Sequence, residues 1–386
     1  MKVSVIGLGK AGLPLAATIA DAGIDVVGVD ISQERVNAVN KGSDVIPEEN
    51  GLGPLIKKYG GKRLKGVTDY KYAAKECSAY IVIVPLFIDK YKKPDFSNIK
   101  TAFENLSNMI KDGDLMVLET TVPIGTTDDI VKPILDKSGK NYFLAYSPER
   151  IMTGYAISRY KEFPKIVGGI NEASSKKAHE LYSKFCENVD VVSDAKTAEM
   201  IKVAEGIYRD VNIAIANELF AVCEKEKIDY YEVREYANHR YCDLHLPGNV
   251  GGHCIPVYPW FLINNFNVPL IKKAREVNDS MIEYYADKLK VKKGKIVVVG
   301  LTYRDNVKEI AYTRSLPMVK LLEKRGYDVY VNDPLFSKEE VEKLGLKFTN
   351  NFENMEGIIL MNKCEKYKER LLKITDRVVD VKGGLL

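Results

Sequence analysis

The sequence lacks the features that mark membrane, secreted and nucleic-acid-binding proteins. Its longest nearly uninterrupted apolar stretch, residues 79–88, is far shorter than the roughly 20 residues of a membrane-spanning helix. The first residues run directly into a predicted strand, without the apolar segment and cleavage site of a signal peptide. The 57 basic and 53 acidic residues nearly cancel, and the basic ones are scattered. We therefore expect a cytoplasmic protein without a membrane or nucleic-acid partner.

The six cysteines also lack a pattern. They lie far apart and form no CxxC pair, as is typical of thiols in a reducing compartment. A zinc site from Cys242, His245, His253 and Cys254 is disfavoured, because two adjacent ligands from one dipeptide fit tetrahedral geometry poorly. The sequence thus predicts free thiols and no bound metal.

What the sequence does contain is apolar material for two or three cores, since 46% of its 386 residues are hydrophobic. In the first third, β-branched runs alternate with helical patterns, which predicts a parallel sheet. Its expected strands are residues 2–6, 25–29, 79–84, 115–119 and 142–145. From Ala195 an apolar-periodic stretch of about 30 residues predicts a helix about 45 Å long. After a helical stretch at 271–290, a second α/β unit is expected, with strands at 295–299 and 328–332 around a helix at 316–325.

A glycine motif follows the first expected strand. Gly7, Gly9 and Gly12 form GxGxxG before a helix at 13–22, and Asp30 ends the second strand. The glycines permit a tight turn, close approach of a pyrophosphate and close helix–sheet packing, with the phosphates at the helix N-terminus. Asp30 would accept hydrogen bonds from ribose hydroxyls and repel a 2′-phosphate. The motif predicts a Rossmann domain that binds NAD rather than NADP.

Two further segments supply candidate site residues. Thr121 follows an expected strand at the edge where open α/β sheets bind ligands, and a structural role is the alternative. The next helix carries acidic residues in its first turn, and we expect Thr126 or Thr127 to cap it. Cys254 follows two glycines, which favours an exposed thiol, although burial is the more common fate of a cysteine. Lys202 lies within the apolar period of the long helix, and a solvated lysine is the alternative.

Seven segments, in order, resemble the UDP-glucose/GDP-mannose dehydrogenase family of nucleotide-sugar 6-dehydrogenases over almost the whole chain. They are VIGLGKAGLPLA, ETTVPIGTT, YSPERI, AEMIKVAEGIYRDVNIAIANEL, PGNVGGHCIPVYPWF, AREVND, and GLTYR followed by NDP. The GGHC and PERI forms resemble the branch that oxidises UDP-N-acetylhexosamines, with UDP-N-acetyl-D-mannosamine as the first choice of substrate. The alternatives are a 6-dehydrogenase for UDP-glucose, GDP-mannose or another UDP-N-acetylhexosamine, and a nucleotide-sugar-binding homologue that has lost the second oxidation.

The resemblance implies a four-electron oxidation of the sugar C6 alcohol to a carboxylate, with NAD as cofactor. It assigns Cys254 as the nucleophile, Lys202 to oxyanion stabilisation and Glu149 to water activation. Thr121 completes the expected catalytic set. The cofactor-binding residues that it implies are Gly7, Gly9, Lys10, Ala11, Gly12, Asp30, Arg35, Pro85 and Thr121. The substrate-binding residues are Arg150, Lys202, Arg209, Arg240, Gly248, Gly251, Gly252, His253, Tyr303 and Arg304.

The expected fold is therefore α/β in three parts. Residues 1–190 form an NAD-binding Rossmann domain, residues 191–291 a central all-helical domain for dimerisation and catalysis, and residues 292–386 a Rossmann-like UDP-sugar-binding domain. We expect a homodimer, because the long helix has more apolar positions than one stripe requires. These positions are Ile201, Val203, Ile207, Val211, Ile213, Ile215, Leu219 and Val222.

Three positions depart from the family pattern. Gly206 stands where the family has an asparagine, one turn after the lysine, and Tyr258 stands where it has an aspartate, four residues after the cysteine. The first change removes a hydrogen-bond donor and costs roughly 1 kcal/mol of helix propensity, and the second removes a carboxylate. Either the site is rebuilt from other groups or turnover is slow. A family arginine is also replaced by Ala311, and Arg314 or Lys308 is the expected substitute.

Overall fold

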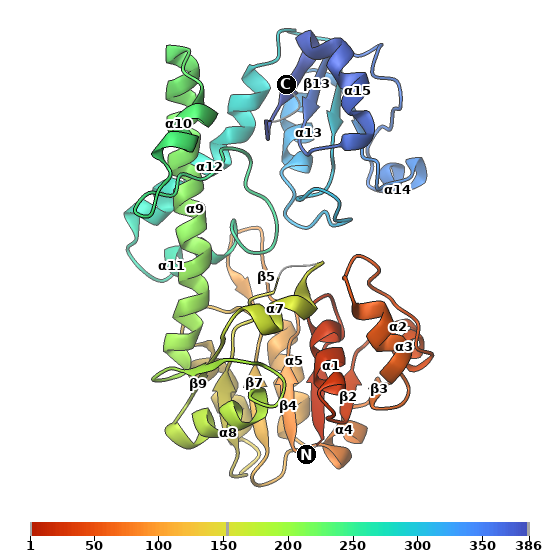
Figure 1. Ribbon diagram of the computed structural model, residues 1–386, viewed down its shortest axis with the longest axis vertical. Helices are drawn as coiled ribbons and strands as arrows, with labels where there is room; N and C mark the ends of the chain where they lie inside the picture. The colour runs from red at the N-terminus through yellow and green to blue at the C-terminus, as the bar shows by residue number, and fades with distance from the viewer. Residues whose placement is uncertain (1, 152–153, 384–386) are drawn as a thin grey trace. The chain divides into compact units, whose positions relative to one another are not determined.

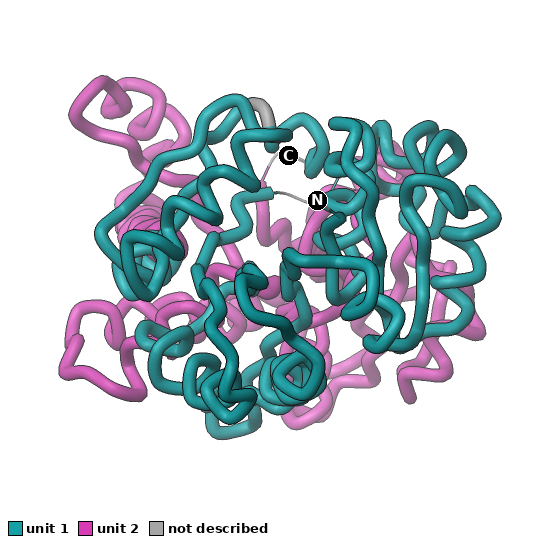
Figure 2. The backbone as a smooth tube through the Cα atoms, turned by 90° about the horizontal axis from the view of Figure 1, so that it is seen from below, with its two compact units in different colours: residues 1–204 teal, residues 205–386 magenta. Residues whose placement is uncertain are grey.

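The computed structural model describes residues 2–151 and 154–383, and the chain divides into two compact units. Unit 1 comprises residues 1–204 and unit 2 comprises residues 205–386 (Figure 2). The predicted α/β architecture is confirmed, with a mostly parallel sheet in unit 1, a parallel sheet in unit 2 and a long helix that includes the boundary between their residues (Figure 1). The expected division into three domains at 190 and 291 stays a prediction.

The sheet of unit 1 has the strand order β10-β9-β8-β7-β4-β1-β2-β3. The strands are β1 (Val3–Ile6), β2 (Val26–Val29), β3 (Leu64–Val67), β4 (Ala79–Val82), β7 (Leu115–Leu118), β8 (Phe143–Tyr146), β9 (Lys165–Gly169) and β10 (Val189–Val191). The five expected strands are confirmed to within two residues at each end. The strands from β3 to β8 are parallel, whereas β9 runs antiparallel to β8.

Both faces of this sheet are buried, which explains why its strands are apolar without alternation. In β4, Ala79 and Ile81 join one core, and Tyr80 and Val82 join the other. The first core includes residues of α1 (Gly12–Asp21), α2 (Gln33–Asn40), α3 (Leu52–Tyr59), α7 (Ala156–Glu162) and α8 (Glu172–Tyr182). The second includes residues of α4 (Tyr70–Glu76), α5 (Ser97–Ser107), the π-helical turn η1 (Thr127–Val131) and α6 (Lys132–Asp136). A short hairpin, β5 (Phe87–Ile88) with β6 (Pro94–Asp95), lies between β4 and α5 in the chain.

The predicted long helix is confirmed as α9 (Ala195–Glu226), which has 32 residues. It begins in unit 1, where Ala195 and Ala198 pack in the second core, and continues into unit 2. The helices α10 (Tyr230–Ala237), α11 (Tyr258–Ile263) and α12 (Pro269–Asp287) follow, and α12 ends before the expected residue 290. Within the described ranges, no helix is both long and apolar enough to cross a membrane.

The sheet of unit 2 is parallel, with the order β12-β11-β13-β14. Its strands are β11 (Lys295–Val299), β12 (Asp328–Asn332), β13 (Gly357–Leu360) and β14 (Val378–Asp380), and its helices are α13 (Ser315–Lys324), α14 (Lys338–Lys343) and α15 (Lys368–Leu371). The bounds expected for β11 and β12 are confirmed. Ile296 and Val298 face one core, while Val297 and Val299 face the other, so this sheet is also buried on both sides.

Candidate active site

The turn between β1 and α1 has the geometry of a dinucleotide-binding turn. Gly7 has φ +99°, and a Cβ there would lie 2.6 Å from the Ile83 carbonyl oxygen. A Cβ on Gly12 would lie 2.8 Å from Ile83 Cγ2, whereas a Cβ on Gly9 would meet nothing within 4 Å. Internal packing therefore requires Gly7 and Gly12, while the space beside Gly9 is open. The N-terminus of α1 at Ala11 has no side-chain cap, so the turn fits a pyrophosphate.

Asp30 ties the end of β2 to this glycine turn. Its buried carboxylate accepts hydrogen bonds from the backbone N–H groups of Leu8 and Ser32, both at 2.8 Å. Arg35 Nη1 lies 3.1 Å from the same carboxylate. The structure thus brings Asp30, Arg35 and the glycine turn together. Lys10, on the same turn, forms a 3.2 Å ion pair with Glu48.

Three expected site residues follow neighbouring strands at one edge of the sheet. Gly7, Pro85 and Thr121 come after the carboxyl ends of β1, β4 and β7, which are adjacent in the sheet. Beyond β1 the strand order continues through β2 and β3, so the order reverses between β4 and β1. Open α/β sheets bind ligands outside such a reversal point. Pro85 is exposed and Thr121 is half-buried there.

The expected capping of the following helix by Thr126 or Thr127 is wrong. The Thr126 hydroxyl donates to the Pro123 carbonyl at 2.6 Å, and the Thr127 hydroxyl donates to the Glu199 carboxylate at 2.7 Å. The N–H groups of Thr127 and Gly125 also donate to Glu199, at 2.8 and 2.5 Å. Glu199, from α9, replaces a local cap because the tertiary fold brings a charged acceptor to these donors. Burial raises the pKa of Glu199 to about 7, although these hydrogen bonds lower it.

Glu149 is held by a set of directed hydrogen bonds directly after β8. Its Oε1 accepts from the N–H groups of Arg150 and Ile151 at 2.8 and 2.9 Å. Its Oε2 accepts from the Tyr160 hydroxyl at 2.9 Å. A cavity of about 10 Å³ is lined by Glu149, Tyr160 and Lys165 among other residues, which is roughly the space that one water needs.

A second carboxyl group, Glu119, is hydrogen-bonded to Glu149. Glu119 is fully buried, forms an ion pair with the Lys165 ammonium, and accepts a 2.5 Å hydrogen bond from the Tyr182 hydroxyl. Burial raises the pKa of Glu119 to about 8, against the lowering effect of Lys165. Burial also opposes ionisation of Glu149, but Lys165, the hydrogen bonds from Glu119 and Tyr160, and the charge of Lys202 hold its pKa below the usual value. The surroundings therefore favour ionisation of Glu149 over that of Glu119.

Sequence reasoning missed Glu119, Lys165 and Glu199. The visible signal for Glu119 was a carboxyl group at the end of an apolar strand, which predicts a polar partner in the core. No local pattern identifies that partner, because Lys165 lies 46 residues further along the chain.

In unit 2, the glycines before Cys254 are pressed against two tyrosines. Gly252 has φ +94°, and a Cβ there would lie 2.6 Å from the Tyr303 ring. Its N–H donates to the Tyr312 carbonyl at 3.2 Å, and a Cβ on Gly251 would lie 3.1 Å from the same oxygen. His253 packs edge-on against both rings, at centroid distances of 6.4 and 5.6 Å. The structure therefore brings the glycine pair, His253 and Tyr303 together.

Cys254 is the one exposed cysteine of the six, and four others are buried. All six are free thiols, which confirms that expectation. The loop before Cys254 is anchored at Gly248, whose N–H donates to Asn217 of α9 at 2.7 Å. In the described part of the chain, no three His, Cys, Asp or Glu side chains are grouped to hold a metal ion.

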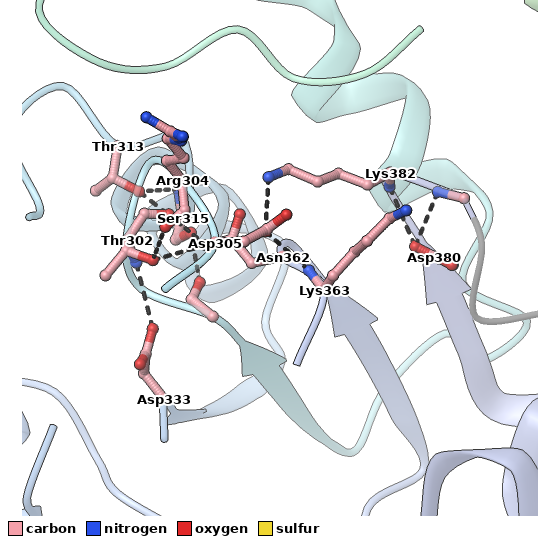
Figure 3. A network of polar contacts seen from close by, with 12 residues as sticks. Thr302, Arg304, Asp305, Thr313, Ser315, Asp333, Asn362, Lys363, Asp380 and Lys382 are labelled. Atoms are coloured by element: carbon pink, nitrogen blue, oxygen red, sulfur yellow. Dashed lines mark hydrogen bonds and ion pairs between the residues drawn. The ribbon is translucent and has the colours of Figure 1, made fainter. Parts of the chain in front are cut away.

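The turn after β11 carries a polar network at the carboxyl edge of the second sheet (Figure 3). Asp333 accepts from the Leu301 N–H at 2.6 Å, and Asn362 donates to the Thr302 hydroxyl oxygen at 2.9 Å. Lys382 forms a 2.8 Å ion pair with Asp305, as Figure 3 shows. These contacts fix the backbone from which Arg304 projects.

The basic side chains expected near this turn differ in their partners. Lys308 is ion-paired with Glu340 at 2.6 Å, and Arg314 with Asp279 at 3.0 Å. Among residues 2–151 and 154–383, no hydrogen bond or ion pair engages the Arg304 guanidinium. Both expected substitutes for the family arginine, Lys308 and Arg314, thus already form an ion pair within the protein.

Three other expected substrate residues are arginines in different parts of the chain. Arg150 Nη1 donates to the Pro164 carbonyl in unit 1 at 3.1 Å. Arg209 is exposed on α9, and Arg240 is exposed with its guanidinium 5.4 Å from the centroid of the Tyr241 ring.

Comparison with protein families finds matches to three domains of one family. The models of the UDP-glucose/GDP-mannose dehydrogenase family match as the NAD binding domain over residues 1–186, the central domain over 196–280 and the UDP binding domain over 297–384. The chain belongs to this family. It is an NAD-dependent nucleotide-sugar dehydrogenase and hence an oxidoreductase. The glycine turn, Asp30 and the strand-order reversal lie in its NAD binding domain.

Similar proteins include several archaeal dehydrogenases. The UDP-N-acetyl-D-mannosamine dehydrogenase of Methanococcus maripaludis is 38% identical over 86% of this chain and 79% of its own. That of Methanocaldococcus jannaschii is 34% identical over 98% of this chain and 93% of its own. A solved structure, the UDP-D-ManNAc dehydrogenase of Pyrococcus horikoshii, has a TM-score of 0.86 at 28% identity, covering 98% of this chain and 93% of that one.

Proposed function

We propose that this dehydrogenase oxidises UDP-N-acetyl-D-mannosamine at C6 in two steps, from alcohol through aldehyde to carboxylate. The observation that carries the two-step reaction is the exposure of Cys254, after a glycine pair packed on tyrosines, while the other thiols are at least partly covered. The choice of sugar is supported by the names of the relatives from Methanococcus and Methanocaldococcus. The free thiols favour a reducing compartment, so the proposed location is the cytoplasm.

NAD bound at the glycine turn would accept the hydride of the first oxidation, and a second NAD, bound after the first NADH has left, would accept that of the second. Between the two oxidations, the Cys254 thiolate attacks the aldehyde carbon and forms a thiohemiacetal. Loss of a second hydride from that carbon leaves a thioester, and water then cleaves the C–S bond, releasing the carboxylate and the thiolate. A thiol suits this sequence because it is both a strong nucleophile and a good leaving group.

Two side chains of unit 1 have proposed roles in the same sequence. Lys202 stabilises the oxyanions, as a fixed positive charge. Glu149 takes the proton from the hydrolytic water. The adjoining small cavity supports this role, and the lowered pKa of Glu149 keeps it in the ionised form that can accept a proton. Thr121, at the carboxyl edge of the sheet, is proposed to position the reacting C6. The other expected contact residues are retained as proposals for cofactor and substrate binding.

The decisive experiment is a panel of UDP-sugars with NADH counted per sugar consumed. We expect two NADH for UDP-N-acetyl-D-mannosamine and slower turnover of UDP-glucose. Cys254→Ser should yield no acid, because an oxygen ester resists the hydrolysis that a thioester undergoes. Two NADH and a wild-type rate of acid formation from Cys254→Ser would refute the covalent mechanism. A second candidate, a homologue that stops at the aldehyde, is favoured by the Gly206 and Tyr258 departures and predicts one NADH per sugar.

We also propose a homodimer built on α9. Val203 and Ile207 are buried within the chain, but Ile215, Leu219 and Val222 are exposed at spacings of four and three, on one helix face. A second copy of α9 is the proposed cover for this face. Leu219→Glu should then shift the sedimentation coefficient from dimer to monomer at micromolar concentration. A wild-type monomer under these conditions would contradict the proposal.

A further inference from the structure

Gly206 and Tyr258, two of the positions that depart from the family pattern, are in direct contact within unit 2. A Cβ on Gly206 would lie 3.2 Å from Cγ and 3.3 Å from Cβ of Tyr258, and closer still to Cδ2 of the ring. The ring is buried and stacks on Phe261, with a centroid distance of 5.8 Å and an interplanar angle of 27°. The side chain at 258 therefore occupies the space that any side chain at 206 would need.

This contact accounts for a glycine in the interior of α9. Glycine weakens a helix because its backbone loses the most conformational freedom on ordering. Gly206 has no positive φ that would require it for backbone reasons. The remaining reason is the close approach of the Tyr258 ring to the helix backbone.

The same tyrosine is tied to the cysteine. The Tyr258 N–H donates to the Cys254 carbonyl at 3.0 Å, and the Val257 N–H donates to it at 3.1 Å. Cys254 and Tyr258 therefore belong to one turn, which leads into α11. On α9, Lys202 precedes Gly206 by four residues, so helix periodicity places both on one face.

We propose that Gly206 and Tyr258 form a single coupled replacement. Tyr258 is then a positioning residue, because its ring packs against the α9 backbone at Gly206 and so fixes the turn that carries Cys254. The inference rests on the proposed function for the role of Cys254. Asparagine at 206 would collide with Tyr258, and aspartate at 258 would leave a void over Gly206. Only a paired change conserves the packed volume at this contact.

The test compares Gly206→Asn, Tyr258→Asp, the double variant and Tyr258→Phe with the wild type. We expect Gly206→Asn and Tyr258→Asp each to lower the unfolding midpoint, and each to reduce the rate of acid formation about tenfold. The double variant should recover most of the lost stability and most of the lost rate. Tyr258→Phe should stay within about threefold of the wild type, since it keeps the ring. Gly206→Ala, which adds only a Cβ, serves as the mild variant should Gly206→Asn fail to fold.

The stoichiometry separates positioning from simple destabilisation. If Tyr258 positions the thiol, the single variants should release aldehyde, so that NADH per sugar falls from two toward one while the KM for the UDP-sugar is retained. A loss of folded protein alone would lower the rate and leave the stoichiometry at two. Unchanged stoichiometry, additive effects in the double variant, or a Tyr258→Phe defect equal to that of Tyr258→Asp would each overturn the inference.

Cys254→Ser, assayed in parallel, distinguishes a failure of the proposed covalent mechanism from a failure of the coupling between positions 206 and 258. If that variant still makes the acid, the proposed mechanism fails, and non-additive unfolding midpoints at 206 and 258 still decide whether the two positions are coupled. If Cys254→Ser makes no acid and the double variant is no better than the singles, the coupling fails alone.

Discussion

Lys165 is the residue whose removal should cost unit 1 the most among its lysines. Its side chain is 5% exposed and its partner Glu119 is 0% exposed, so the ion pair is fully buried. Lys165→Met keeps much of the side-chain volume but leaves Glu119 and Glu149 in contact without a cation. Removing one partner of a buried pair costs about 3–5 kcal/mol. For a unit of 204 residues, this corresponds to a fall in Tm of roughly 6–20 °C.

The loss should grow with pH. Lys165 lowers the pKa of both Glu119 and Glu149, so its removal raises both values. A carboxyl group whose folded pKa is raised contributes stability that is complete below its unfolded pKa and is lost as pH rises through the folded one. The folded pKa of Glu119 is already about 8 in the wild type. The deficit of Lys165→Met should therefore be smaller near pH 5, where protonation of the two carboxyls in the variant is more favourable, than near pH 8.

Denaturant unfolding followed by far-ultraviolet circular dichroism, at both pH values, measures this difference. Lys2→Met is the matched control, because Lys2 forms a 2.7 Å ion pair with Glu76 but is 43% exposed. Exposed ion pairs contribute little to stability, so this variant should unfold almost as the wild type does. Equal, small losses for the two lysine variants at pH 8 would refute the assignment of a buried charged pair.

Three further outcomes are expected. Gly9→Ala should leave the unfolding midpoint unchanged but weaken NAD binding in a fluorescence titration. Gly7→Ala should instead lower the unfolding midpoint, and a lowered midpoint in Gly9→Ala would contradict the open space at that position. The wild type should use NAD far better than NADP in kcat/KM, and Asp30→Ser should narrow that ratio; equal use by the wild type would sink the role of Asp30. Burial raises the pKa of Glu199 to about 7, so the stability that this group contributes is complete below about pH 4.5 and is lost toward pH 7. In Glu199→Gln the unfolding free energy should therefore decline less across that pH interval, and an unaltered slope would contradict this role of Glu199.

The sequence by itself determined the elements whose signals are local. The strands β1 and β11 are rich in β-branched residues, and β12 alternates valine with other residues. Helix α9 has a helical apolar period, so the positions of these elements follow from local spacing. The glycine turn and Asp30 were also predictable, because a tight turn and an acid after the second strand form a short pattern along the chain. The ordered segments that resemble the family led to the nucleotide-sugar dehydrogenase class.

Only the tertiary structure decided which groups complete the candidate site. Thr127 is joined to Glu199 across 72 residues, and Glu119 to Lys165 across 46. Gly206 and Tyr258, each a separate departure in the sequence, proved to share one space. Such partners have no fixed sequence spacing. Burial, rather than periodicity, requires that each polar group has a hydrogen-bond partner and that each void is filled.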